Sequence, residues 1–389
     1  MTAYLDHAAS TPPRPEAVEA MLPFLRDSYG NPSGTHPMAR AARKAIDEAR
    51  EVVAEALGAQ PGEVVFTSGG TESDNLAVFG VLDQRVATGA GAIAVASAVE
   101  HHAVLDPVVS RHGRLVSVDA RGRIDLEGLA AALDPTVALV SVMAVNNEVG
   151  TIQPLDEIAA LVRRLAPDAV IHTDAVQAVQ WLDLGHLGSL VDLVSISGHK
   201  FGGPKGAGAL VVRDGVALAA RALGGGQERE RRSGTQNVAG IVGLGAALRV
   251  TLDSRDTVVE RTTKLRDRLI DGLLASVPDL IETGAGPPAD HGGPDRSHRI
   301  PGIAHVCIPG VDSESLLFLL EKAEVYASAA SSCASGAMEP SHVLAGMGVA
   351  TEVAAGSLRL SLGYASVDGD VDAVLAAVPP AVERLRLFS

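Results

Sequence analysis

A buried strand that ends in a lysine turn is predicted by the segment Val191-Asp192-Leu193-Val194-Ser195-Ile196-Ser197-Gly198-His199-Lys200-Phe201-Gly202-Gly203-Pro204-Lys205-Gly206. The apolar run is typical of a strand that is covered on both faces. α/β enzymes place their chemistry where such strands end. A hydroxyl and an imidazole beside Lys200 are suited to holding a phosphate, so the segment favours a lysine that forms a Schiff base with pyridoxal phosphate. The alternative is a solvated lysine in a loop.

Apolar runs with helical patterns between them extend through the first two-thirds of the chain. Besides the strand Val191–Ser195, we predict strands at Glu63–Thr67, Ala92–Ser97, Arg114–Val118, Val137–Val142, Ala169–Thr173 and Ala207–Val212. Met38–Leu57 and Leu155–Leu165 have the pattern of helices. This alternation predicts an α/β fold with a mainly parallel, seven-stranded sheet.

The last third of the chain has a different order of elements. Asp256–Val277 predicts a long amphipathic helix, and the Gly/Pro-rich stretch Thr283–Gly302 predicts a mobile loop. The pattern then gives a strand, a helix, a second strand and a terminal helix, the first three at Ala304–Ile308, Ser313–Ala323 and Ser357–Leu362. We therefore expect a smaller α+β domain after the large one.

Composition excludes several classes of function. The 389 residues carry 32 basic and 47 acidic side chains, a net charge of −15, which does not favour a nucleic-acid partner. No apolar run reaches the ~18 residues of a membrane span, and no signal peptide is evident at the start. Cys307 and Cys333 are too few for a disulfide framework. We expect a cytoplasmic protein with no membrane partner.

Further strand ends carry polar side chains. The strand Glu63–Thr67 is followed by two glycines and the start of a helix, where Thr71 and Asp74 resemble a capping box. The free backbone N–H groups of such a helix start bind phosphate. The alternative is an ordinary capped helix. Asp174 is the residue that ends another predicted strand, and its carboxylate is suited to pairing with a protonated pyridine nitrogen. Gln177 could then reach the hydroxyl of the pyridine ring. The alternative is that Asp174 is a helix N-cap.

The segment Glu100-His101-His102 and the pair Asn146-Asn147 follow two more of the predicted strands. An imidazole at this edge is able to stack on a planar cofactor and exchange protons. Adjacent histidines without a third ligand at suitable spacing do not predict a metal site. Five strand ends thus deliver phosphate donors, an imidazole, an amide, a carboxylate and a lysine to one edge.

With these motifs the chain resembles the NifS/IscS-like cysteine desulfurases of the class V aminotransferase group, which are pyridoxal-phosphate enzymes of fold type I. The resemblance rests on Tyr4–Ala9, Gly30–Ser33, Thr71–Asn75, Glu100–His102, Asn146–Glu148, Asp174–Gln177, Ser197–Lys200, Arg232–Thr235, Cys333, Glu339–His342 and Leu358–Gly363. It implies a large pyridoxal-phosphate domain at 15–260 and a small domain of residues 1–14 and 261–389 that carries the cysteine loop.

The resemblance also implies a role for each matching residue. The catalytic residues are Lys200, Cys333 and His101. Cofactor-binding roles fall on Gly70, Thr71, His101, Asn147, Asp174, Gln177, Ser197, His199, Lys200 and Thr235, the last from the partner in a homodimer, and substrate-binding roles on Asn31, Asn147 and Arg359.

The implied activity converts L-cysteine to L-alanine and an enzyme persulfide on Cys333, for transfer to a sulfur-acceptor protein such as an iron–sulfur scaffold. Cys333 lies among small residues, whereas Cys307 in a core strand is expected to be buried and inert. The alternatives are a selenocysteine lyase, a cysteine sulfinate desulfinase and a non-catalytic scaffold protein that binds pyridoxal phosphate.

Overall fold

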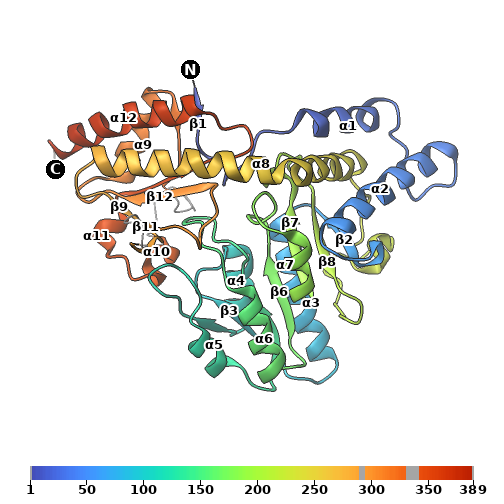
Figure 1. The fold of residues 1–389 in the computed structure, drawn as a ribbon. Coiled ribbons are helices and arrows are strands. Elements are labelled where there is room, and N and C mark those ends of the chain that lie inside the picture. The colour runs from blue at the N-terminus through green and yellow to red at the C-terminus, as the bar shows by residue number, and fades with distance from the viewer. Residues whose placement is uncertain (1, 289–293, 330–340, 388–389) are drawn as a thin grey trace.

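A seven-stranded sheet forms the centre of the computed structural model, which describes residues 2–288, 294–329 and 341–387 (Figure 1). The strands are β2 (Val64–Thr67), β3 (Ile93–Ser97), β4 (Arg114–Val116), β5 (Val137–Ser141), β6 (Val170–Asp174), β7 (Leu193–Ser197) and β8 (Gly208–Val212). Their order is β2-β8-β7-β6-β5-β3-β4, and only β8 runs antiparallel to its neighbours. The predicted mainly parallel sheet of seven strands is confirmed.

Helices cover both faces of this sheet, as its apolar strands require. The core on one face includes side chains of α3 (Gly70–Ala87) and α4 (His102–Ser110). The core on the other face includes side chains of α2 (Pro37–Ala56), α6 (Leu155–Leu165) and α7 (Leu184–Leu190), together with α5 (Leu126–Ala132). Because both faces are covered, ligands have access to the sheet only at its edges.

The helix α8 (Val238–Ser276) has 39 residues and connects two separate cores. Ile241 and Leu248 near its start belong to the core of the large sheet, whereas Leu265 and Leu273 belong to a second core. The sequence predicted only its second half, from Asp256. Glycines in the first half conceal the helix, because they lower helix propensity.

Close packing explains those glycines. A Cβ atom on Gly243 would lie 2.7 Å from the Sδ atom of Met21 in α1 (Pro15–Arg26), and one on Gly245 would lie 3.1 Å from the Cα atom of Ala49 in α2. The contact with α1 and α2 therefore overrides helix propensity in this part of α8.

The second core lies around a three-stranded antiparallel sheet of order β14-β12-β9 (Ser357–Ser361, Ile303–Cys307 and Ile281–Glu282). The helices α9 (Ser313–Lys322) and α12 (Asp368–Arg386) pack on it, and β1 (Ala3–Tyr4) pairs with β13 (Val325–Tyr326) beside it. The short helices α10 (His342–Gly346) and α11 (Thr351–Ala354) precede β14. The N-terminus thus joins the C-terminal part; the predicted domain boundary, which falls inside α8, stays a prediction.

The segment predicted as a mobile loop, Thr283–Gly302, contains structure in its described part. Its two short strands, β10 (Gly286–Pro288) and β11 (Pro294–Asp295), pair with each other. Arg296 and Arg299 both bind the buried carboxylate of Glu282, and Arg299 is itself 4% exposed. The described part is therefore not a loop without structure, and its mobility stays a prediction. No helix within the described residues is long and apolar enough to cross a membrane.

We predict that Gly245→Val lowers the free energy of unfolding by about 1–3 kcal/mol, because the new side chain must push α2 away from α8. Chemical denaturation measures this change. Gly369→Ala in α12 is the control, since a Cβ atom there meets nothing within 4 Å. Equal stability of the two variants would contradict the close approach of the helices.

Candidate active site

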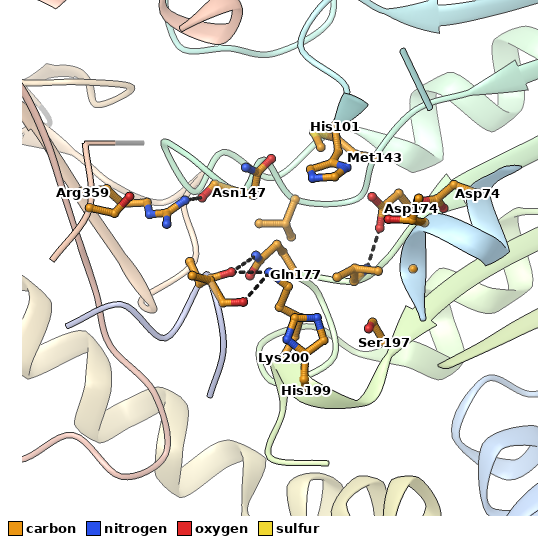
Figure 2. A pocket seen from close by; sticks show the side chains of 17 residues that line it. Asp74, His101, Met143, Asn147, Asp174, Gln177, Ser197, His199, Lys200 and Arg359 are labelled. Atoms are coloured by element: carbon orange, nitrogen blue, oxygen red, sulfur yellow. Dashed lines mark hydrogen bonds between the residues drawn. The ribbon is translucent and has the colours of Figure 1, made fainter. Parts of the chain in front are cut away.

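A cavity of about 450 Å³ lies at the carboxyl edge of the parallel strands, between the two cores. Figure 2 shows its polar side chains converging from several elements, with Arg359 on one side and Asp74 and Asp174 on the other. The residues that line it are Ala8, Ala9, Gly70, Thr71, Asp74, His101, Met143, Val145, Asn147, Asp174, Val176, Gln177, Ser197, His199, Lys200, Ser328 and Arg359. Most of the residues predicted from strand ends are brought together here.

Lys200 closes the turn that follows β7, and its backbone is fixed on two sides. Thr11 Oγ1 and Gln180 Nε2 donate to its carbonyl oxygen at 2.9 and 2.7 Å. Its Nζ donates to the carbonyl oxygens of Ala8 at 2.5 Å and Ala9 at 3.0 Å. Burial, with a contribution from the charge of Arg359, lowers the pKa of Lys200 to about 8. The amine is therefore a better nucleophile near neutral pH than an ordinary lysine.

The start of α3 forms a cradle of backbone groups. Its N-cap, Gly69, has φ 152°, and no side chain caps the helix. A Cβ atom on Gly70 would lie 2.8 Å from Val176 Cγ2, so the close approach requires glycine. The positive end of the helix dipole and its first N–H groups favour an anion here. Thr71, Ser197 and His199 also line the cavity.

The predicted capping box of Thr71 and Asp74 is wrong. Glu72 Oε2 instead accepts a hydrogen bond from the backbone N–H of Ser68 at 2.7 Å. Asp74 is 1% exposed and lines the cavity, where its carboxyl is too far inside the protein to cap the helix. Because the helix starts at Gly70, two residues earlier than the motif implied, its cap position falls on Gly69.

Asp174 and His101 face each other across the cavity. Asp174 is the last residue of β6, and its Oδ1 accepts from the N–H of Val176 at 2.8 Å in a tight turn, so it is not a helix N-cap. Burial raises the pKa of Asp174, and the nearby His101 and Lys200 oppose this rise. His101 Nδ1 accepts from Ala103 N–H at 3.1 Å, and burial lowers the pKa of its ring.

Arg359 enters the cavity from β14, opposite the carboxylates. Its Nη1 donates to the backbone oxygen of Asn147 at 3.0 Å, and its Nη2 donates to Asp6 Oδ1 at 3.0 Å. These bonds orient a planar donor fork of the kind that binds carboxylates in a bidentate way. Gln177 Nε2 donates to the carbonyl oxygen of Ala8 at 2.9 Å.

Two predicted residues do not line the cavity in this chain. Asn31 is exposed and accepts a hydrogen bond from the N–H of Ser33, and Thr235 is exposed in the loop before α8. Cys333 lies outside the described residues. Cys307 is buried as predicted; Thr283 Oγ1 lies 3.5 Å from its Sγ, and burial raises the pKa of the thiol.

Sequence reasoning gave no role in this site to Asp74, Ser328 or Asp6, which lie in it or beside it. Asp74 was visible as an acidic residue within a motif, but its position two turns from a strand end gave no sign of its burial. Ser328 is held by backbone hydrogen bonds with Arg359 in both directions. That pairing joins residues distant in sequence, and no local pattern predicts it.

The residue pattern and fold match one known family. The family model described as Aminotransferase class-V matches residues 3–374. The chain belongs to this family. It is 45% identical to the IscS-like cysteine desulfurase of Mycobacterium tuberculosis over 99% of this chain and 97% of that one.

Solved structures resemble this class V chain over 94% of its length or more. A NifS-like protein superposes with a TM-score of 0.88 at 34% identity, covering 100% of both chains. The structure titled SspA in complex with cysteine has a TM-score of 0.79 at 32% identity, over 94% of this chain and all of that one. These likenesses confirm the predicted fold type.

We predict that the amine of Lys200 reacts with trinitrobenzenesulfonate with a half-maximal rate near pH 8, because only the unprotonated amine reacts and burial lowers its pKa. An ordinary lysine reaches half its maximal rate near pH ~10.4. Peptide mass spectrometry follows the reaction of Lys200 across this pH range in protein without pyridoxal phosphate. A half-maximal rate near pH ~10.4 for Lys200 would contradict the lowered pKa.

Proposed function

We propose that the protein is a cysteine desulfurase that uses pyridoxal phosphate to convert L-cysteine to L-alanine and a persulfide on Cys333. The observation that carries this proposal is one cavity with Lys200, Asp174 and His101 beside an anion cradle and Arg359 on its far side. The membership of class V and the identity to cysteine desulfurases support it.

The residues of the cavity fit pyridoxal phosphate. The cradle at Gly69 and Gly70 leaves no room for a Cβ atom at Gly70, as expected where backbone approaches a phosphate. Asp174 is a buried carboxyl without a basic partner among the described residues, so a protonated pyridine nitrogen would compensate its charge. Lys200 supplies the amine, His101 a ring to stack, and Gln177 an amide near the ring hydroxyl.

The bound cofactor supplies an electron sink for the carbanion formed at the substrate Cα atom. Arg359 holds the substrate carboxylate, and Asn147 lies beside it. The amine of Lys200 takes and returns the proton at Cα, which its lowered pKa favours near neutral pH. The ring of His101 has a lowered pKa and is therefore neutral, so it is able to accept a proton from the substrate.

Sulfur transfer needs a second nucleophile. The thiolate of Cys333 attacks the substrate sulfur; an S–S bond forms as the substrate Cβ–S bond breaks, and its electron pair remains on the carbon skeleton, which is protonated to alanine. No external oxidant is required. The described residue Ser328, which precedes Cys333 in the sequence, lines the cavity.

We expect Cys333→Ala to bind cofactor and cysteine, shown by changes in the visible spectrum, but to form no persulfide. Cys307→Ala is the matched control; it should retain most activity and lose about 1–2 kcal/mol of stability, as small core truncations do. Mass spectrometry after one turnover without reductant locates the added sulfur. Sulfur on Cys307, or wild-type alanine production by Cys333→Ala, would favour a lyase that needs no cysteine.

We further propose a homodimer with shared sites and an acceptor protein that takes the persulfide sulfur. The segments that carry Asn31 and Thr235 also carry exposed large side chains, Tyr29 at 75% and Leu223 at 86% exposure. Contiguous exposed apolar surface is typical of an interface, and we propose that Tyr29 and Leu223 belong to such a surface. Isologous pairing would place Thr235 of one subunit at the phosphate of the other.

Mixed dimers test this arrangement. In the proposed dimer each site uses Lys200 of one subunit and Thr235 of the other. In a mixed dimer of Lys200→Ala with Thr235→Glu, one site therefore contains both changes and the other contains neither. We expect such a mixed dimer to have about half the wild-type activity. Lys200→Ala mixed with Asp174→Ala is the control, because both residues serve the same subunit's site and no intact site can form. Equal activity of the two mixtures would contradict sharing of the site through Thr235.

A further inference from the structure

Three carboxyl groups lie close together at one side of the cavity, on elements that are distant in the sequence, and two of them, Asp74 and Asp174, line it. Asp74 comes from α3, Glu100 from the turn between β3 and α4, and Asp174 from the end of β6. They are 1%, 0% and 7% exposed. Figure 2 shows Asp74 beside Asp174 on the side of the cavity away from Arg359. The proposed function assigns a role only to Asp174.

Among the described residues, none of these carboxyls forms an ion pair with lysine or arginine. Lys200 donates to backbone carbonyls, and Arg359 pairs with Asp6. Glu100 Oε1 accepts from Met143 N–H at 2.9 Å, whereas its Oε2 has no hydrogen-bond partner. The Oδ1 atom of Asp74 also has no hydrogen-bond partner.

The imidazole nearest to Asp74 does not neutralise it. His172 Nε2 lies 3.6 Å from Asp74 Oδ1, but its two ring nitrogens are occupied by the hydroxyls of Ser141 at 2.8 Å and Ser195 at 3.0 Å. Burial lowers the pKa of His172 to about 3, so the ring is neutral. It therefore acts as a dipole between two serines and supplies no positive charge to the cluster.

Three buried negative charges without cations would repel one another at great cost. A carboxyl in such a place keeps its proton, unless a nearby positive charge stabilises the ionised form. Asp174 is the member that faces His101 and Lys200. We propose that Asp74 and Glu100 are positioning residues that each hold a proton in the working enzyme and thereby confine the negative charge of the cluster to Asp174.

The pKa directions agree with this geometry. Burial raises the pKa of Asp74 well above its usual value, the charge of Asp174 adds to the rise, and a hydrogen bond with Ser195 opposes it. Burial likewise raises the pKa of Glu100, and Asp174 adds to it. The inference deepens the proposed function, because the single charge on Asp174 would pair with the pyridine nitrogen while the two neutral acids do not compete for it.

Infrared spectroscopy tests the protons directly. A protonated carboxyl group has a carbonyl stretch that an ionised one lacks. We expect two such bands at pH 8, where ordinary carboxyls are ionised and Glu148, whose pKa is raised to about 7 by burial, has lost most of its proton. Uniform ¹³C labelling of aspartate should shift one band and labelling of glutamate the other, in the wild-type protein.

Variants assign the bands. Asp74→Asn should remove the aspartate band and Glu100→Gln the glutamate band, whereas Glu72→Gln, a carboxyl paired with Arg232, should leave both. Asp174→Asn should keep both bands and shift their titration to lower pH by about 1 unit or more, because a like charge is removed. A purely structural role for Asp74 would not produce this shift.

Absence of both bands at pH 8, or bands whose titration is unchanged in Asp174→Asn, would overturn the proposal. The spectra are recorded with and without added pyridoxal phosphate, and the bands are expected in both. A protein that binds no pyridoxal phosphate would refute the proposed function, whereas the spectra without cofactor would still decide whether Asp74 and Glu100 hold protons.

Discussion

The N-terminal segment from Asp6 to Thr11 holds the two halves of the site together by hydrogen bonds, and the cavity depends on it. Ser361 Oγ in β14 accepts from Ala8 N–H, while the carbonyl of Ala8 accepts from both Lys200 and Gln177. Asp6 binds Arg359 on the side of the small sheet. This short segment therefore forms hydrogen bonds with both Lys200, beside the large sheet, and Arg359, in the small sheet. Displacing this segment would remove hydrogen bonds from both Lys200 and Arg359.

Desolvation is the main cause of the electrostatics around this segment. The cavity lowers the pKa of Lys200 and His101 and raises that of Asp174, because each charged form loses water and gains few charged partners. The same constraint explains why the backbone, rather than acids, receives the lysine amine. A carboxylate partner would hold the amine in its charged form and make it a poor nucleophile. Burial thus shifts the lysine and the imidazole toward their neutral forms.

Much of this arrangement could be predicted from sequence, since parallel strands deliver their end residues to one edge. The apolar run before Lys200 and the strand before Asp174 were sufficient to predict that both side chains meet. The predictions that failed concern features that depend on contacts between segments distant in the sequence. The first half of α8 is rich in glycine because α1 and α2 press against it, and the arginines of the segment after Thr283 bind Glu282. Neither partner is visible in a local pattern.

The two cysteines show how far burial alone can separate roles. Cys307 points into a core with Val343 and Leu344, and its pKa is raised, so the reactive thiolate is disfavoured there. Its strand, β12, pairs along its length with β14, which carries Arg359. A reactive or bulky thiol adduct at Cys307 would therefore press on the strand that positions the arginine. A cysteine that carries sulfur must be able to form a thiolate and reach the substrate, and the position of Cys307 in the core and in the supporting sheet rules out both.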